Sequence, residues 1–195
     1  MNADVISSQP DRRALLRLGA GFLGASALSA VPVLALAAGG DSWATIENFS
    51  PAGKSLGLAR VHKVVKSEAE WKRQLSANSF EITRHAGTEP AFSGVYWNNH
   101  ADGLYRCICC DTALFDSRTK FESGTGWPSF FQPISKRNVV QSNDSTLGMS
   151  RIAISCTRCD AHLGHVFDDG PKPTGLRYCM NSAALRFGAR GKQQA

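Results

Sequence analysis

Two pairs of cysteines place the strongest constraint on the fold of this chain. Cys107 and Cys110 form one C-x-x-C motif, and Cys156 and Cys159 form a second. Four thiolates are the number that a tetrahedral structural zinc needs, and a gap of two residues lets one tight turn present both sulfurs. Because 45 residues separate the pairs, the metal would join two distant hairpins. Two disulfides are the competing interpretation, since an oxidising compartment would allow them.

Two further cysteines stand outside this set. Cys109 lies inside the first motif, and it could be an inert buried thiol, an alternative metal ligand or a redox partner. Cys179 lies in a segment, 177–181, whose period of two as a strand would put Arg177, Cys179 and Asn181 on one face. A guanidinium two residues from a thiol favours the nucleophilic thiolate. On spacing alone, Cys179 could equally be a small core residue.

Two histidines and an aromatic cluster are further candidates for a site. His162 and His165 could serve as general acids, and Gly164 between them could permit a bulge that turns both imidazoles to one side. Satisfied structural histidines are the alternative. Residues 126–131 form an aromatic cluster around Trp127 that is interrupted by Pro128, and its simplest interpretation is core.

The remaining pattern predicts a mainly β domain. Short segments rich in β-branched and aromatic residues alternate with Gly, Pro, Asn and Asp, which favours antiparallel strands. The predicted strands are 94–97, 104–106, 138–141, 149–155 and 177–181. Before them, Ser67 and Glu70 form a capping box that opens a short helix. The net charge is +6, but no block of five basic residues occurs, so we expect no nucleic-acid partner.

The N-terminus has the pattern of an export signal. Arg12 and Arg13 precede an uncharged stretch, 18–38, that contains the small-residue sequence Ala-Leu-Ala at 35–37. The paired arginines predict a twin-arginine signal, although Asp11 and Leu15 depart from its usual pattern. An uncleaved anchor and a plain secretory leader are the alternatives. We expect cleavage near Ala37 and a periplasmic location.

The chain is predicted to have four parts. They are a signal peptide at 1–37, a linker or loose arm at 38–62, the main domain at 63–188 and a frayed basic tail at 189–195.

Several motifs of the main domain, taken in order, closely resemble the methionine-R-sulfoxide reductases, the B-type family that reduces the R epimer of methionine sulfoxide. They include Glu-Ser-Gly-Thr-Gly-Trp-Pro-Ser-Phe, His-Leu-Gly-His-Val-Phe and Arg-Tyr-Cys-Met-Asn-Ser. The matching segments are 88–94, 105–107, 120–130, 161–167 and 173–182. The resemblance implies two small antiparallel sheets with short N-terminal helices. It also implies one structural zinc, held by the four paired cysteines far from the active site.

The resemblance further implies an enzyme, a peptide-methionine (R)-S-oxide reductase with a cysteine nucleophile. The Cys179 thiolate would attack the sulfoxide sulfur and end as a sulfenic acid. His162 and His165, with Asp169 nearby, would help to protonate the departing oxygen. The remaining site residues implied are Trp127 and Phe167 for substrate binding, and Arg177 and Asn181 for orienting the site and favouring the thiolate.

One departure from the family pattern concerns turnover. Many members place a resolving cysteine where this chain has Thr125. We therefore expect an external thiol or a thioredoxin-like periplasmic partner to reduce the sulfenic acid, with Cys109 as the alternative. The expected role is repair of oxidised exported proteins by a monomer. Two rival functions are a zinc-ribbon-like binding module and a disulfide oxidoreductase that uses one C-x-x-C pair.

Overall fold

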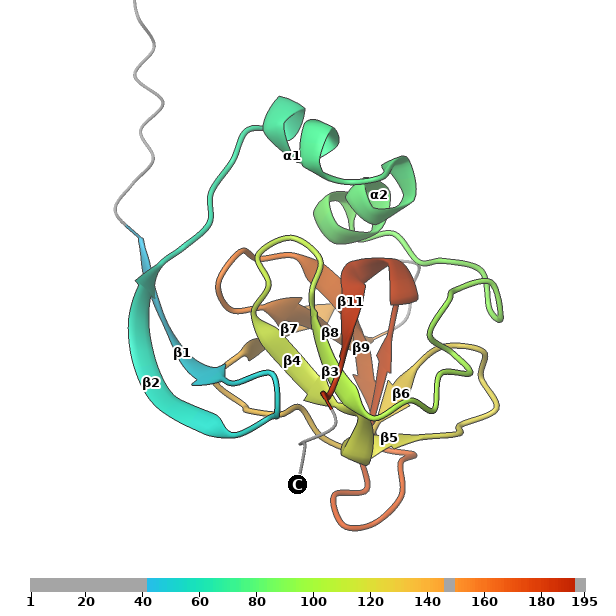
Figure 1. Ribbon diagram of the computed structural model, residues 1–195. Coiled ribbons are helices and arrows are strands. Elements are labelled where there is room, and N and C mark those ends of the chain that lie inside the picture. The colour runs from blue at the N-terminus through green and yellow to red at the C-terminus, as the bar shows by residue number, and fades with distance from the viewer. Residues whose placement is uncertain (1–41, 146–149, 192–195) are drawn as a thin grey trace, which may run out of the picture. The chain divides into compact units, whose positions relative to one another are not determined.

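Two antiparallel sheets form the body of the computed structural model, which describes residues 42–145 and 150–191 (Figure 1). The six-stranded sheet contains, in spatial order, β5 (Lys120–Phe121), β6 (Ser129–Phe130), β10 (Arg177–Met180), β9 (His162–Phe167), β8 (Arg151–Cys156) and β7 (Val139–Asp144). The three-stranded sheet contains β11 (Leu185–Ala189), β3 (Gly103–Cys107) and β4 (Ala113–Asp116). The predicted mainly β fold with two small antiparallel sheets is confirmed.

Aromatic rings from both sheets fill the core. Phe115 on β4 stacks on Phe130 of β6, with ring centroids 4.4 Å apart. Tyr105 on β3 contacts the same ring edge to face at 5.0 Å, and Tyr178 of β10 lies 5.9 Å from Phe115. Each such pair contributes about 0.5–1.5 kcal/mol beyond its area burial. The aromatic cluster at 126–131 therefore supplies Phe130 to the core, as its simplest interpretation predicts.

Two short helices precede the sheets in the chain and lie above them in Figure 1. In α1 (Glu68–Gln74), Ser67 accepts from the Glu70 backbone N–H, and the Glu70 carboxylate accepts from the Ser67 N–H, so the predicted capping box is present. Helix α2 (Ala77–His85) begins at the N-cap Ser76 and ends at Ala86, which has a left-handed backbone conformation. The buried side chains of Trp71, Phe80 and Ile82 attach both helices to the core.

The prediction of a linker or loose arm at 38–62 is wrong from Trp43 onward. β1 (Trp43–Phe49) and β2 (Ser55–His62) pair as an antiparallel hairpin. Asn138, which is fully buried, fixes β1 by accepting from the Glu47 N–H and donating to its carbonyl, both at 2.8 Å. The burial of Ala44 and Ile46 on the inner face of β1 gives the pairing its apolar contribution.

The predicted strand at 94–97 is also wrong, because this segment forms consecutive turns. A Cβ atom at Gly94 would lie 2.3 Å from both the Glu89 carboxylate and the Ser182 hydroxyl. The Tyr96 N–H donates to that same hydroxyl at 3.1 Å rather than to a neighbouring strand. Contacts with distant residues therefore override the local β propensity.

The C-terminal boundary differs as well, because residues 189–191 are not frayed. Ala189 is the last residue of β11. The Arg190 guanidinium forms ion pairs with Asp102 at 3.1 Å and Asp116 at 2.7 Å. These contacts hold the end of β11 against the loop before β3.

The predicted signal peptide and its cleavage site lie outside the described residues, as do Met149 of the predicted strand 149–155 and residues 192–195 of the tail. The rest of that strand is β8. Within the described ranges, no helix is long and apolar enough to cross a membrane.

Candidate functional site

Cys179 lies in the middle of the six-stranded sheet, on β10 between β6 and β9. It pairs with Ser129 on one side and with His165 on the other. The predicted alternation is present, because Tyr178 and Met180 point into the core and are almost fully buried. Directly paired residues of antiparallel strands project to the same face of a sheet, so the Cys179 thiol and the His165 imidazole share one face.

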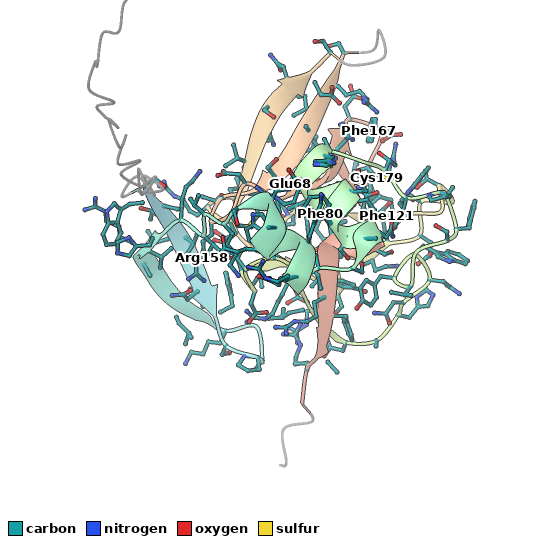
Figure 2. All side chains as sticks on the ribbon, turned by 90° about the horizontal axis from the view of Figure 1, so that it is seen from above. Glu68, Phe80, Phe121, Arg158, Phe167 and Cys179 are labelled. Atoms are coloured by element: carbon teal, nitrogen blue, oxygen red, sulfur yellow. The ribbon has the colours of Figure 1, made fainter. Side chains whose placement is uncertain are left out.

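A pocket of about 130 Å³ opens at this thiol. Figure 2 shows Cys179 and Phe167 close together, and both line this pocket. The lining residues are Thr88, Trp127, Arg151, Gly164, His165, Phe167, Cys179, Met180 and Asn181. Pockets for whole small-molecule ligands usually measure about 300–1,000 Å³, so this one suits a single side chain.

A β-bulge turns the two histidines to one side. Ile154 of β8 pairs with Gly164, whereas the next residue, Ser155, pairs with His162. Leu163 is therefore the extra residue, and the rings of His162 and His165 lie 5.2 Å apart. At Gly164 a Cβ atom would lie 2.1 Å from the Cys179 carbonyl oxygen, so only glycine fits there. The prediction of a bulge at Gly164 is confirmed.

The two imidazoles have different partners. His165 Nε2 hydrogen-bonds to Oδ2 of Asp144 at 2.8 Å. His162 is 7% exposed, and within the part of the chain that the structure describes its Nε2 has no hydrogen-bond partner. Burial, with a smaller contribution from His165, lowers the pKa of His162 to about 4. His162 is therefore neutral near pH 7, whereas the His165 ring is held by the Asp144 carboxylate.

Asp169 lies with Arg177 rather than with the histidines. Arg177 donates from Nε and Nη2 to the two Asp169 carboxylate oxygens, at 2.9 and 2.8 Å. These hydrogen bonds lower the pKa of Asp169. The guanidinium also stacks on Phe167, 4.4 Å from its ring centroid. The carboxylate beside His165 is Asp144, which sequence reasoning missed because it lies within a polar run, 141–145, that resembles a turn.

Burial and charge act in opposite directions on the pKa of Cys179, the candidate nucleophile. Burial raises the pKa of Cys179, and the nearby Arg177 charge lowers it by less. Arg177 therefore lowers the pKa of Cys179, as predicted, but burial has the larger effect and the pKa is raised overall. Thr125 Oγ1 lies 4.0 Å from the Cys179 Sγ, so the position at which a resolving cysteine was expected from the resemblance lies beside Cys179.

Glu89 holds the other wall of the pocket in place. Its buried carboxylate accepts from the backbone N–H groups of Ser182 and Ala183, at 2.6 and 3.0 Å. Its carbonyl accepts from the Trp127 indole N–H at 3.0 Å, and its own N–H donates to the Asn181 side-chain oxygen at 3.0 Å. Glu89 thereby positions both predicted pocket residues. The sequence signal for Glu89 was its position in segment 88–94, one of those that carry the family resemblance. Its role could not be predicted from that segment, because it depends on contacts with residues about ninety positions away.

The four paired cysteines form one cluster. Their Sγ atoms lie within 4.8 Å of one another, with Cys107–Cys159 at 3.6 Å and Cys110–Cys156 at 3.5 Å. A tetrahedral zinc with Zn–S bonds of 2.3 Å requires sulfurs about 3.8 Å apart, whereas a disulfide requires about 2.0 Å. All six cysteines are free thiols. The geometry fits a structural zinc and contradicts the disulfide interpretation.

Each half of this cluster is the same small turn. The Asp111 N–H donates to the Cys107 carbonyl and the Asp160 N–H to the Cys156 carbonyl, both at 2.9 Å. Both aspartates have a left-handed backbone, with φ of 61° and 57°. The short polar side chain of aspartate tolerates this conformation. The sequence repeat C-x-x-C-D therefore encodes a repeated backbone geometry.

The cluster lies apart from the pocket. Cys156 is three residues along β8 from Ala153, which pairs with His165 opposite Cys179. Strand rise and spacing put the Cα atoms of Cys156 and Cys179 on the order of 14 Å apart. Cys109 is buried beside Cys107 and Cys159, so it belongs to the cluster side of the molecule.

Comparison with known proteins gives one consistent result. The family model of the SelR domain matches residues 75–189. The chain is 55% identical over 127 residues to the peptide methionine sulfoxide reductase MsrB of Herminiimonas arsenicoxydans, a match that covers 65% of this chain and 93% of that protein. The chain is 56% identical over 125 residues to the peptide methionine sulfoxide reductase MsrB of Acinetobacter baylyi, a match that covers 64% of this chain and 90% of that protein. The chloroplastic B1 protein of Arabidopsis thaliana is 56% identical over 126 residues, covering 65% of this chain and 62% of that one.

Proposed function

This chain belongs to the SelR-domain family of B-type methionine sulfoxide reductases, and we propose that Cys179 is the nucleophile with which it reduces methionine sulfoxide. Membership makes it an oxidoreductase, a peptide-methionine (R)-S-oxide reductase. The observation that carries the role of Cys179 is its position in a side-chain-sized pocket, opposite His165 and beside Trp127 and Phe167. The substrate class is methionine-R-sulfoxide in peptides and proteins.

The reaction transfers one oxygen atom between two sulfurs. The Cys179 thiolate attacks the substrate sulfur, which is reduced by two electrons to the thioether of methionine. The oxygen leaves the substrate, takes up one proton and ends on Cys179 as a sulfenic acid, so the cysteine sulfur is oxidised by two electrons. Trp127 and Phe167 supply apolar contacts for the substrate methyl and methylene groups.

Recycling requires a thiol from outside the pocket. Thr125 contacts Cys179 but cannot form a disulfide, and Cys109 is buried with the metal cluster. An external thiol or a thioredoxin-like protein therefore attacks the sulfenic acid, releasing water and forming a mixed disulfide that a second thiol resolves. The export pattern at residues 1–37 supports action on oxidised periplasmic proteins, with a periplasmic reductant as the partner.

The proposal is tested by mass spectrometry without reductant. The purified protein is mixed with a peptide that contains methionine-R-sulfoxide, and both molecules are analysed. We expect the peptide to lose one oxygen and Cys179 to gain one. The matched controls are Cys179→Ser, which should leave the peptide unchanged, and Cys109→Ser, which should react like the native protein. A Cys179–Cys109 disulfide would overturn the account of recycling, and an unchanged peptide would overturn the proposed activity.

A further inference from the structure

A carboxylate outside the motifs of the site lies beside His165. Asp144, at the end of β7, accepts through Oδ2 from His165 Nε2 and from Arg151 Nη2, both at 2.8 Å. We propose that Asp144 is a positioning residue that makes His165, rather than His162, the proton donor to the sulfoxide oxygen. This inference rests on the proposed function.

The strand register brings these groups to one face. Asp144 pairs with Arg151, and Ala153 pairs with His165, which in turn pairs with Cys179. Because paired residues and residues two apart share a face, the carboxylate, the imidazole and the thiol all project to the same side of the sheet. The small side chain of Ala153 leaves room for Asp144 to reach His165 diagonally. One carboxylate oxygen therefore fixes the orientation of the ring.

The charges around His165 come from four strands. Asp144 faces it from β7, Arg151 from β8, His162 from β9 and Cys179 from β10. Among these, the carboxylate stabilises an imidazolium, and Arg151 in turn holds the carboxylate. Because Nε2 is bound to Asp144, the proposal requires Nδ1 to be the ring nitrogen that gives its proton to the substrate oxygen.

His162 has the opposite environment. It is neutral near pH 7 because burial lowers its pKa to about 4. It also borders a different hollow, of about 560 Å³, together with Arg84, Ser155 and Asp144. As a neutral imidazole, His162 is a much weaker acid than an imidazolium. Its ring lies beside that of His165, with centroids 5.2 Å apart.

The proton balance follows from this arrangement. When the thiolate attacks, the oxygen that moves to Cys179 needs one proton, and His165 supplies it and becomes neutral. Asp144 stays a carboxylate throughout. His165 regains its proton from solvent before the next turnover, and no electron passes through either residue.

A double-mutant cycle tests the coupling between Asp144 and His165. Single-turnover reduction of a methionine-R-sulfoxide peptide is measured for Asp144→Asn, His165→Gln and the double variant. We expect each single variant to be slower by about 100-fold, within the range for general acid catalysis, and the double variant to be no slower than His165→Gln. Substrate binding should be nearly unchanged. Multiplicative losses in the double variant, or a fully active Asp144→Asn, would overturn the inference.

Two further measurements separate this role from a structural one. In Asp144→Asn the steady-state kcat should fall while the KM for the peptide stays near its native value, because only the proton transfer loses its support; a loss that appears mainly in KM contradicts the proposal. If Asp144→Asn does not retain zinc and cooperative unfolding, Asp144→Ala with added formate replaces it. Rescue of the rate by formate supports the role, and absence of rescue contradicts it.

Asp102→Asn is the matched control, since it removes an exposed carboxylate that pairs with Arg190, and it should react at the native rate. The proposed function is judged separately, by the oxygen gained at Cys179 of the native protein. If that gain occurs while Asp144→Asn remains fully active, only the present inference fails.

Discussion

The two sulfur sites of this protein are built in different ways. Each half of the four-cysteine cluster is a turn of five residues, and the hydrogen bond that closes it lies within that turn. The pocket around Cys179, by contrast, is assembled from β6, β9 and β10 and from Glu89, whose partner Asn181 is 92 residues away. Each half of the cluster is thus encoded locally and the fold only has to bring two finished turns together, whereas no part of the pocket exists before the domain folds.

The surroundings of the sulfurs differ in the same way. Four thiols lie within 4.8 Å of one another and share a geometry that fits one metal ion. Cys179 is a single thiol whose neighbours are the hydroxyls of Thr125 and Ser129 and the charge of Arg177. We therefore expect changes in the cluster to affect stability first, and changes in the pocket to affect the rate first.

The largest effect is expected from removal of one cluster thiol. Cys156→Ser should lose zinc and lower the free energy of unfolding by several kcal/mol, a large share of the roughly 5–15 kcal/mol of a typical domain. Metal content and urea unfolding measure both. The matched control is Cys109→Ser, which removes a buried thiol outside the cluster and should retain the metal. Zinc loss in both variants would contradict the distinction between Cys156, which binds the metal, and Cys109, which only lies beside the cluster.

Glu89→Gln should have the next largest effect. The amide puts an N–H donor against a backbone donor at Ser182 or Ala183, which costs about 2 kcal/mol. Because Trp127 and Asn181 lose a fixed support, kcat/KM should fall as well. Urea unfolding and steady-state kinetics test this change. Glu122→Gln removes a half-exposed carboxylate, and the Lys120 ammonium that it pairs with also donates to the Trp97 carbonyl, so this variant should change neither quantity.

Arg177→Gln should change the pH dependence of the reaction. The guanidinium lowers the pKa of Cys179, so its removal raises that pKa further and reduces the thiolate fraction near pH 7. The rate at pH 7 should fall roughly 10-fold and recover as the pH rises. Single-turnover rates over pH measure this. A loss that persists at high pH would assign Arg177 to substrate binding instead, and the exposed Arg186→Gln is the control.

The smallest effect is expected where the hairpin meets the cluster. Lys63, just after β2, pairs with Asp160 at 2.6 Å, but their side chains are 28% and 57% exposed. Lys63→Met should lower the free energy of unfolding by less than about 1 kcal/mol and leave zinc binding unchanged. Loss of zinc in this variant would show that the hairpin contributes to the cluster.

Several features of the site could be predicted because their causes lie close together in sequence. The capping box at Ser67 and Glu70 depends on residues three apart, and the alternation around Cys179 depends on the period of a strand. Gly164 indicated the bulge because its missing side chain is a property of the residue itself. The hairpin at 43–62 could not be predicted in this way. Its strands have only a short apolar pattern, and β1 is held by Asn138, which lies 91 residues away from Glu47 in sequence.

The sequence alone therefore determined which chemical groups are present and which local turns they form. These are four metal-ligand thiols in two C-x-x-C-D turns, a candidate nucleophile and two histidines on one strand. The tertiary structure decided which groups act together. Only strand register brings Asp144 to His165 and leaves Asp169 with Arg177. Burial of Cys179 outweighs the nearby charge, because desolvation depends on every residue packed around a group and no local pattern encodes it.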